Sequence, residues 1–311
     1  MAMNTGQFQN LYTRRIDLAF FEGWDAVPEQ WSRIYNTVDA KTNNRTTQII
    51  AGVGAWEKSG ENENPNEQRF KLGPIIFTQG EIYKTEITMS REQIKDQLYE
   101  EVANMAKDAG HAGRERVEDT AAQYLQEMFD NTQGTGYDGK PTFANDHPNY
   151  GDNGGTQDNL TTGALSDANL KSAIILFRKQ RDENGKKISS IPNKLVVPQS
   201  LQFTAATILQ SALQAGTTNN DKNVLPNMEL VVNDYWDAYT QTRWFIMGPR
   251  HQVNMIWWDK PEFQKYPIMN KTARKAGSGM HVSRLEPKTG AIRSGPQAHK
   301  EGHYGRNLRT T

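Results

Sequence analysis

The segment from Asp138 to Gly155 gathers the side chains of this chain that look most able to do chemistry. It reads DGKPTFANDHPNYGDNGG and places Asp146 directly before His147, among further carboxylates, Asn side chains and glycines. Such a pair can contribute to a metal site or activate a nucleophile, so a metal-dependent hydrolase is one hypothesis. A turn-rich structural loop is the other, because an Asp carboxylate before His-Pro can accept hydrogen bonds from nearby backbone amides.

The remaining sequence offers this Asp-His pair few catalytic partners. The other histidines show no HxH or HExxH spacing, and the chain has no cysteine. No G-x-S-x-G elbow is present, and the glycine-rich GTGYDG beginning at Gly134 lacks the Gly-Lys-Ser/Thr ending of a phosphate-binding loop. We therefore expect no catalytic residue, no metal and no cofactor, and we interpret the segment as a structural loop.

Composition and charge set the broad class of the protein. A chain of 311 residues with 36% hydrophobic residues predicts a folded protein with room for two subdomains. The sequence contains neither a run of 18 uncharged apolar residues nor an apolar signal core at its N-terminus. The net charge is zero, but residues 251–311 carry +7 and residues 1–250 carry −7. The basic part could face polyanions or pair with the acidic part of a neighbouring copy.

The first ninety residues predict two extensions rather than a core. Residues 1–44 carry scattered aromatic side chains without a sustained helical period, which indicates an arm that packs on another surface. Residues 45–89 contain two β-rich runs, TTQIIAGVGAW and RFKLGPIIFTQGEIYKTEITM, on either side of the polar linker EKSGENENPNEQ. An isolated two-stranded ribbon is marginal in water, so this hairpin is expected to lie on something else.

A long helix is the strongest local prediction. Ser90 and Gln93 form a capping-box pattern, and apolar residues recur at helical spacing behind them to about Asn131. Roughly forty residues correspond to a helix on the order of 60 Å long. Its narrow apolar stripe suggests a sheet lying along it, and a period nearer 3.6 than 3.5 disfavours a coiled coil. Gly110 and Gly113 in its interior predict a bend or a close crossing.

Alternating shorter elements follow the Asp138–Gly155 segment. Ser166 is expected to cap a helix that Gly185 ends, with Leu170, Ala173, Ile174 and Phe177 on one face. The run NKLVVP predicts a buried strand, Ser200 opens a helix through Leu213, and NMELVVN and RWFIMG are further strands. The runs VNMIWWD and MHVSRLEP predict strands in the basic C-terminal part.

Taken together, the order of these parts resembles the major capsid proteins of tailed bacteriophages, which share the Hong Kong 97 fold. Three segments are similar to the Mu-like major head subunit subgroup: DGKPTFANDHPN, GGTQDNLTTGALSDANLKSAIILFRKQRDENGKKI and PNKLVVPQSLQFTAATIL. In that subgroup a D-G-x-x-x-F…H-P segment precedes an N-L…G-x-L-S helix and a strand ending in V-P. The resemblance covers residues 45–250 well and the two ends by position only.

The resemblance implies an α+β fold with five parts. These are an N-terminal arm (1–44), an extended E-loop hairpin (45–90), a peripheral domain with spine helix and connecting loop (91–189), an axial domain (190–248), and return strands to the peripheral domain with a C-terminal tail (249–311).

The same resemblance implies a structural protein that is not an enzyme. It would self-assemble as hexamers and pentamers into the icosahedral shell that encloses the double-stranded DNA genome, in the virion capsid after assembly in the bacterial cytoplasm. Expected partners are further copies, packaged DNA bound non-specifically, a portal, a separate scaffold protein and a decoration protein, without a membrane. Another phage structural protein, such as a tail tube or decoration protein, is the alternative. The expected inter-subunit residues are Trp56, Lys58, Glu61, Glu63, Glu67, Arg69 and Lys71 in the E-loop, and Phe8, Tyr12, Arg14 and Arg15 in the arm.

Overall fold

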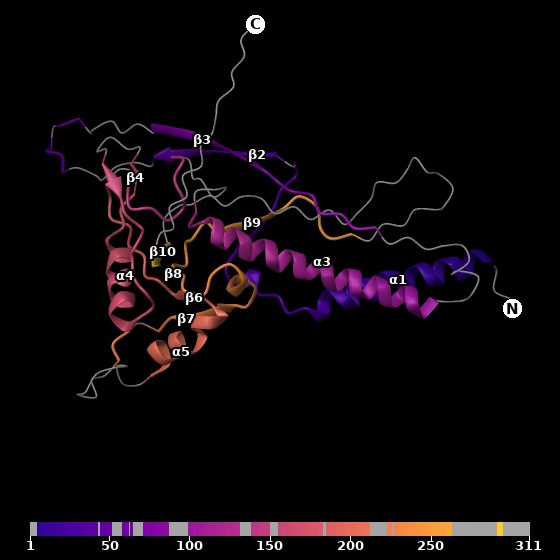
Figure 1. Cartoon of the computed structure of the whole chain (residues 1–311). Helices are drawn as coiled ribbons and strands as arrows, with labels where there is room; N and C mark the ends of the chain where they lie inside the picture. The colour runs from indigo at the N-terminus through magenta and orange to yellow at the C-terminus, as the bar shows by residue number, and fades with distance from the viewer. Residues whose placement is uncertain are drawn as a thin grey trace, which may run out of the picture.

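A long helical rod, a separate β-hairpin and a sheet-centred body make up the protein (Figure 1). The structure is a computed structural model. It describes residues 5–42, 44–51, 58–61, 63–64, 71–86, 99–130, 138–149, 155–182, 185–211, 223–225, 227–262 and 291–294.

The helices and strands alternate along the chain as follows. The helices are α1 (Thr5–Ala26), α3 (Tyr99–Glu127), α4 (Asp167–Lys179) and α5 (Gln202–Gln210), with short 3-10 helices η1 (Trp31–Arg33), η2 (Gln199–Leu201) and η3 (Tyr235–Ala238). The strands are β1 (Asn36–Asp39), β2 (Asn44–Ala51), β3 (Lys71–Gln79), β4 (His147–Pro148), β5 (Thr156–Gln157), β6 (Lys194–Pro198), β7 (Glu229–Asn233), β8 (Trp244–Met247), β9 (Asn254–Trp257) and β10 (Ala291–Ser294).

A four-stranded sheet in the order β10-β8-β6-β7 forms the centre of the body. The β6–β7 pair is parallel, whereas β8 runs antiparallel to both β6 and β10. Successive β6 residues reach opposite faces of the sheet, because Leu195 and Val197 belong to one hydrophobic cluster and Val196 to the other. A strand that is buried on both faces is expected to be apolar throughout, as KLVVP is.

Helices cover both faces of this sheet. Helices α4 and α5 contribute Leu170, Phe177 and Ala205 to the cluster on one face. The other face packs against the C-terminal half of α3, including Val117 and Leu125. The sheet is therefore the middle of three layers, and it joins the spine helix to the shorter helices.

Helices α1 and α3 lie side by side as a rod that extends away from the sheet (Figure 1). Residues from α1 and from the N-terminal half of α3, among them Ile16, Ala19, Val102 and Ala106, form a small buried cluster of their own. Helix α3 thus packs on α1 with its first half and on the sheet with its second half.

The structure corrects several expected boundaries of the helices. Helix α3 begins at Tyr99 within the described residues and ends at Glu127, about one turn before the expected end. The expected capping box at Ser90 and Gln93 lies outside the described residues. Helix α4 ends at Lys179 instead of at Gly185, although Ser166 caps it as predicted, accepting a hydrogen bond from the Asn169 backbone N.

Two further expectations are wrong in detail. Helix α5 ends at Gln210, and Ser200 does not cap it; the Ser200 hydroxyl and backbone N donate to Asp237 of η3 instead. Residues 80–86, where strand alternation was expected, lie beyond the end of β3. Tyr83 takes part in an isolated β-bridge, but the described residues on either side of it do not continue as a strand.

The C-terminal strands join two different neighbours. Strand β9 pairs in parallel with β1, which follows α1 and η1, whereas β10 pairs with β8 at one edge of the four-stranded sheet. The expected strand MHVSRLEP lies outside the described residues.

Candidate assembly surfaces

The β2–β3 hairpin presents large apolar side chains to solvent. The two strands pair antiparallel over Asn44–Ala51 and Lys71–Gln79, with a register irregularity between Gln48 and Ile50, and they form a sheet of their own. In β3 the exposed fractions are 64% for Leu72, 63% for Ile75 and 58% for Phe77. Ile75 and Phe77 are two residues apart and share one face of the strand. Among the described residues, this face of the hairpin therefore remains exposed.

The described part of the hairpin tip is polar and acidic. Lys58, Glu61 and Glu63 are exposed there, and the Gly60 backbone N donates to Glu63 Oε2 at 2.9 Å, which closes a tight turn. Lys71 lies at the start of β3. The other expected E-loop residues, Trp56, Glu67 and Arg69, lie outside the described residues.

Helix α1 is the main departure from the expected arm, because the sequence interpretation foresaw no helix in this segment. Its backbone touches that of α3: a methyl group at Gly23 would lie 1.9 Å from the Lys107 carbonyl oxygen, and one at Gly110 would lie 2.0 Å from the Phe20 carbonyl oxygen. Such an approach requires glycine on both helices. The close crossing predicted from Gly110 is therefore confirmed, and α1 is the element that crosses there.

Two ion pairs join α1 to α3, and a third joins the segment just after α1 to α3. Arg15–Glu100 and Glu22–Lys107 lie between the helices, and Glu29, three residues beyond the end of α1, pairs with Arg114. Each pair joins residues 85 positions apart, and their numbering rises together, so the two helices run parallel. The segment 1–44 was expected to pack on another surface, and within the described residues α1 packs on α3.

The expected arm residues have different surroundings. Arg14 and Arg15 are exposed on α1, and Arg15 Nη2 lies 2.5 Å from Glu100 Oε1. Phe8 and Tyr12 belong to α1, but their side chains lie outside the described part of the chain. Their predicted role in assembly stays a prediction.

A buried carboxylate joins the segment that follows α1 to helix α3. Glu118 of α3 is 0% exposed and accepts hydrogen bonds from the backbone N atoms of Gln30 and Trp31, each at 3.0 Å. Burial raises the pKa of the Glu118 carboxyl, while these two bonds and the charge of Arg114 oppose that rise. Because an exposed glutamate on a helix looks the same in sequence, nothing in the sequence marked this contact.

The surface near α5 exposes two more apolar side chains that sequence reasoning missed. Phe203 is 80% exposed and Val224 is 73% exposed. Ala205 and Ile208 form the buried side of α5, and Phe203 lies off that stripe. A large apolar residue off the buried stripe of a helix is the one signal that could have identified this surface.

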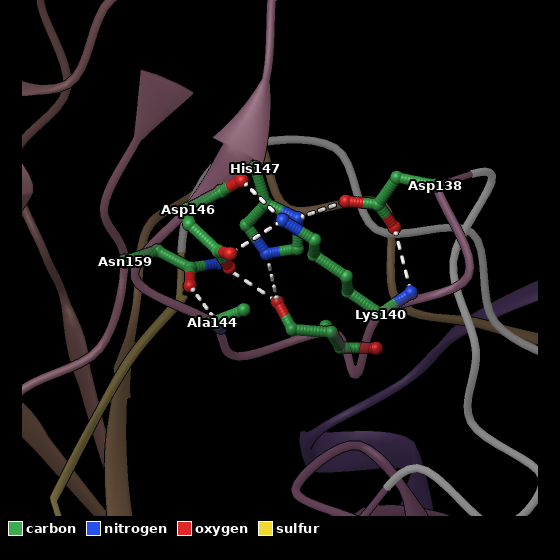
Figure 2. Close-up of polar contacts among 7 residues, drawn as sticks. Asp138, Lys140, Ala144, Asp146, His147 and Asn159 are labelled. Carbon is green, nitrogen blue, oxygen red and sulfur yellow. Dashed lines mark hydrogen bonds and ion pairs between the residues drawn. The ribbon is translucent and has the colours of Figure 1, made fainter.

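The Asp138–Gly155 segment forms a closed hydrogen-bond network (Figure 2). His147 Nδ1 lies 2.7 Å from Asp138 Oδ2, and His147 Nε2 lies 3.1 Å from the carbonyl oxygen of Thr142. Lys140 Nζ lies 2.6 Å from Asp146 Oδ2 and also donates to the Asp146 carbonyl at 2.7 Å. Both ring nitrogens of His147 and the carboxylate of Asp146 therefore have partners within the loop.

A second set of hydrogen bonds attaches this loop to the chain that follows it. Asn159 Nδ2 donates to the Thr142 carbonyl at 2.8 Å, and Asn159 Oδ1 accepts from the Ala144 backbone N at 2.9 Å (Figure 2). The short β4–β5 pair closes beside these contacts. The arrangement fixes the path from α3 toward α4, and it supports the structural interpretation of the loop.

The described residues contain no group of three or more His, Cys, Asp or Glu side chains that could hold a metal ion. Within the same part of the chain, no helix is long and apolar enough to cross a membrane.

Comparisons with known proteins identify the class of this fold. The procapsid protein of bacteriophage JBD30 superposes with a TM-score of 0.53 at 14% identity, covering 75% of this chain and 100% of that one. The JBD30 capsid gives 0.52 at 13% identity, covering 68% and 91%, and the capsid of Ralstonia phage GP4 gives 0.50 at 11% identity, covering 87% of each chain. At these identities the likeness defines the fold, which is that of phage capsid proteins of the Hong Kong 97 type.

The sequence itself identifies the family. A phage capsid protein family model matches residues 79–275, which is more than half of the chain, whereas no curated protein matches it in sequence. The chain belongs to this phage capsid protein family and is a structural major capsid protein.

Proposed function

We propose that this chain assembles as hexamers and pentamers into an icosahedral shell around double-stranded DNA, and that its hairpin docks on a neighbouring copy. The observation that carries the docking proposal is the exposed apolar face of β3, formed by Ile75 and Phe77. Burying a large apolar side chain contributes about 1.5–3 kcal/mol, so covering this face would favour association strongly. A neighbouring copy is the occupant, because shells consist of repeated subunits that share one interface.

The expected E-loop and arm residues enter this proposal in different ways. Lys58, Glu61 and Glu63 lie at the exposed end of the hairpin, where they can reach beyond their own subunit. Arg14 is exposed on the rod formed by α1 and α3, so the rod would present it to a neighbour. Arg15 already contacts Glu100 within its own chain and would contribute through the rod as a whole.

The proposal also includes contacts around the symmetry axes, contacts with DNA and the other proteins of the particle. Phe203 and Val224 would meet their counterparts around the symmetry axes of hexamers and pentamers, since both are exposed apolar residues. The shell would contact DNA only through non-specific backbone interactions. Scaffold, portal and decoration proteins would join the particle, and assembly would take place in the bacterial cytoplasm.

A non-enzymatic role completes the proposal. The pairing of His147 with Asp138 and Thr142, and of Asp146 with Lys140, supports it, because a catalytic base or metal ligand needs a nitrogen or oxygen that faces a substrate or an ion.

The docking role of the hairpin can be tested by making its apolar face polar. The double variant Ile75→Ser/Phe77→Ser is expected to fold with an unchanged circular dichroism spectrum but to form few or no shells in electron micrographs. Ile82→Ser is the matched control, because Ile82 is 46% exposed and lies just beyond β3. Normal shells from the double variant would contradict the proposed docking.

A further inference from the structure

A cluster of basic side chains lies where α4 ends and the chain turns back on itself. The cluster, called the basic patch below, consists of Arg178, Lys179, Arg181, Lys186 and Lys187, and all five side chains are exposed. Within the described residues, none of the five forms an ion pair with an acidic side chain. Arg181 donates one hydrogen bond, to the Gly185 carbonyl at 2.8 Å.

A tight turn brings these residues together. The Asp182 backbone N donates to the Lys186 carbonyl at 2.8 Å, and the Ile188 backbone N donates to the Gln180 carbonyl at 3.0 Å. Gly185 has a φ of 76°, in the left-handed region that favours glycine. Asp182, the acidic side chain described within the turn, accepts a hydrogen bond from the Lys186 backbone N at 2.7 Å and so helps to close it.

The turn places two like charges directly opposite each other. Arg181 and Lys187 lie opposite each other in an antiparallel bridge. The backbone hydrogen bonds join the residues on either side of these two, so Arg181 and Lys187 form the non-hydrogen-bonded type of antiparallel pair. Side chains approach most closely in such pairs, where the Cα atoms are about 4.5 Å apart. Like charges in this position destabilise the pairing, so an anionic partner would relieve a repulsion that the free subunit retains.

The surroundings of the basic patch favour a protein partner over a phosphate backbone. Ile175 lies one helical turn before Arg178 and Lys179 on the same face of α4, and it is 55% exposed. Ile191 follows the turn and is 58% exposed. A surface that combines cations with large apolar residues matches a partner carrying both carboxylates and apolar side chains, whereas the DNA backbone offers phosphates alone.

The hairpin of a second copy has this composition. The stretch from Glu57 to Arg69 carries four glutamates (Glu57, Glu61, Glu63 and Glu67) against Lys58 and Arg69, which gives a net charge of −2. Glu61 and Glu63 are exposed, and the apolar face of β3 continues along the same hairpin. We infer that the acidic hairpin tip of one copy docks on the basic patch of a neighbouring copy, and that their opposite charges set the register of this contact. The inference rests on the proposed function, since it requires that copies come together.

Charge reversal on each side, and on both, tests this contact in the full-length chain. Lys186→Glu/Lys187→Glu and Glu61→Lys/Glu63→Lys are each expected to raise the protein concentration at which shells appear by roughly tenfold, which corresponds to about 1.4 kcal/mol. The quadruple variant is expected to restore shells to near the unmodified level, because attraction returns with the signs exchanged. Arg250→Glu/Lys260→Glu, at two exposed cations outside the patch, is the matched control.

Several results would overturn the inference. Unchanged shell formation in both double variants would do so, and so would a quadruple variant that is no better than either double variant. Normal shells that retain less nucleic acid in Lys186→Glu/Lys187→Glu would identify DNA as the partner instead. Thermal unfolding of each variant separates a folding defect from an assembly defect.

A measurement without shells separates this inference from the proposed function. Sedimentation of the soluble subunit is expected to show self-association that weakens as salt rises from 0.05 to about 0.5 M, because the Debye length shortens over that range. This salt dependence should disappear in either double variant. Salt-sensitive association without any shell would contradict the proposed function alone, whereas shells with salt-independent contacts would contradict the inference alone.

Discussion

The carboxylate of Asp138 lies 2.7 Å from His147 Nδ1 and 3.1 Å from the Lys140 backbone N, and the Asp138 side chain is 2% exposed. Burial acts to raise the pKa of Asp138, but the hydrogen bonds from His147 and Lys140 outweigh it and hold the pKa below its ordinary value. A carboxyl group whose pKa is lowered by folding stabilises the folded chain at pH values above the group's ordinary pKa. That contribution is lost as the pH falls through the lowered pKa.

Asp138→Asn is therefore expected to lower the unfolding temperature at neutral pH and to have less effect in acid. The measurement is thermal unfolding of the variant and the unmodified protein at a series of pH values from 7 down to about 2.5, a range that spans the ordinary Asp pKa. Asp146→Asn is the control, because that exposed carboxylate pairs with Lys140 at the surface and should change the unfolding temperature little. A deficit for Asp138→Asn that is equal at both ends of the range would contradict this account.

Residue types alone predicted part of this loop. The absence of further ligands and of a nucleophile motif was enough to favour a structural loop over a hydrolase. The sequence drew attention to Asp146 because it directly precedes His147, whereas the structure pairs His147 with Asp138, nine positions earlier. Adjacent residues point in different directions along an extended backbone, so the carboxylate beside a histidine in sequence is seldom the one that reaches its ring.

At the scale of elements, the rod formed by α1 and α3 depends on two glycines that bring the backbones into contact. Gly110→Ala would place a methyl group 2.0 Å from the Phe20 carbonyl oxygen, and Gly23→Ala would place one 1.9 Å from that of Lys107. Alanine favours a helix over glycine by about 1 kcal/mol. The overlap of the added methyl group with backbone atoms costs more than the gain in helix propensity, because the two helices must separate along their length to relieve it.

Each of these variants is expected to destabilise the protein by about 1–3 kcal/mol, the usual cost of forcing an extra methyl group into a packed contact. Denaturant unfolding measures the change. Gly113→Ala is the matched control, because its methyl group would meet the Trp24 ring at 3.2 Å, where a side chain can shift. Equal stability of Gly110→Ala and Gly113→Ala would show that the two helices do not touch at Gly110.

Elements with strong local patterns were predicted well, and those that depend on distant partners were not. The strands KLVVP, ELVVN, WFIM and NMIW and the buried face of α4 follow from continuous apolar runs or helical spacing. Helix α1 was missed because few of its residues from Arg14 onward, where burial is described, are buried, and Gly23 fits its place only when α3 lies against it. The ends of α4 and α5 shifted because turns and contacts between elements, such as Ser200 with Asp237, decide where a helix stops.

At the scale of the whole molecule, the hairpin and the body are expected to have separable roles. Strands β2 and β3 form their own sheet, and the main hydrophobic clusters belong to the body. Deleting the tip from Glu57 to Gln68 should therefore leave a folded subunit that does not assemble.

Circular dichroism and size-exclusion chromatography of the deletion variant, with electron microscopy of the same sample, provide the measurement. A folded, non-assembling subunit is the expected result, because the described tip residues 58–61 and 63–64 form hydrogen bonds with one another and not with the body. Shells indistinguishable from those of the full chain would refute the proposed role of the tip.

The overall architecture was accessible from the order of the elements, whereas the assembly surfaces were accessible only in part. The expected E-loop residues came from position along the hairpin, and the exposed face formed by Ile75 and Phe77 emerged only in three dimensions. Exposure of an apolar residue depends on which neighbours cover it, and a single sequence does not record those neighbours.

Electron microscopy of the purified full-length chain shows whether many copies close into a shell. We expect closed shells, or hexamer and pentamer rings on the path to them, formed by this protein alone or with a scaffold protein supplied in the same cell. Monomers that persist at high concentration with scaffold present, or stacked tubes in place of shells, would contradict this expectation.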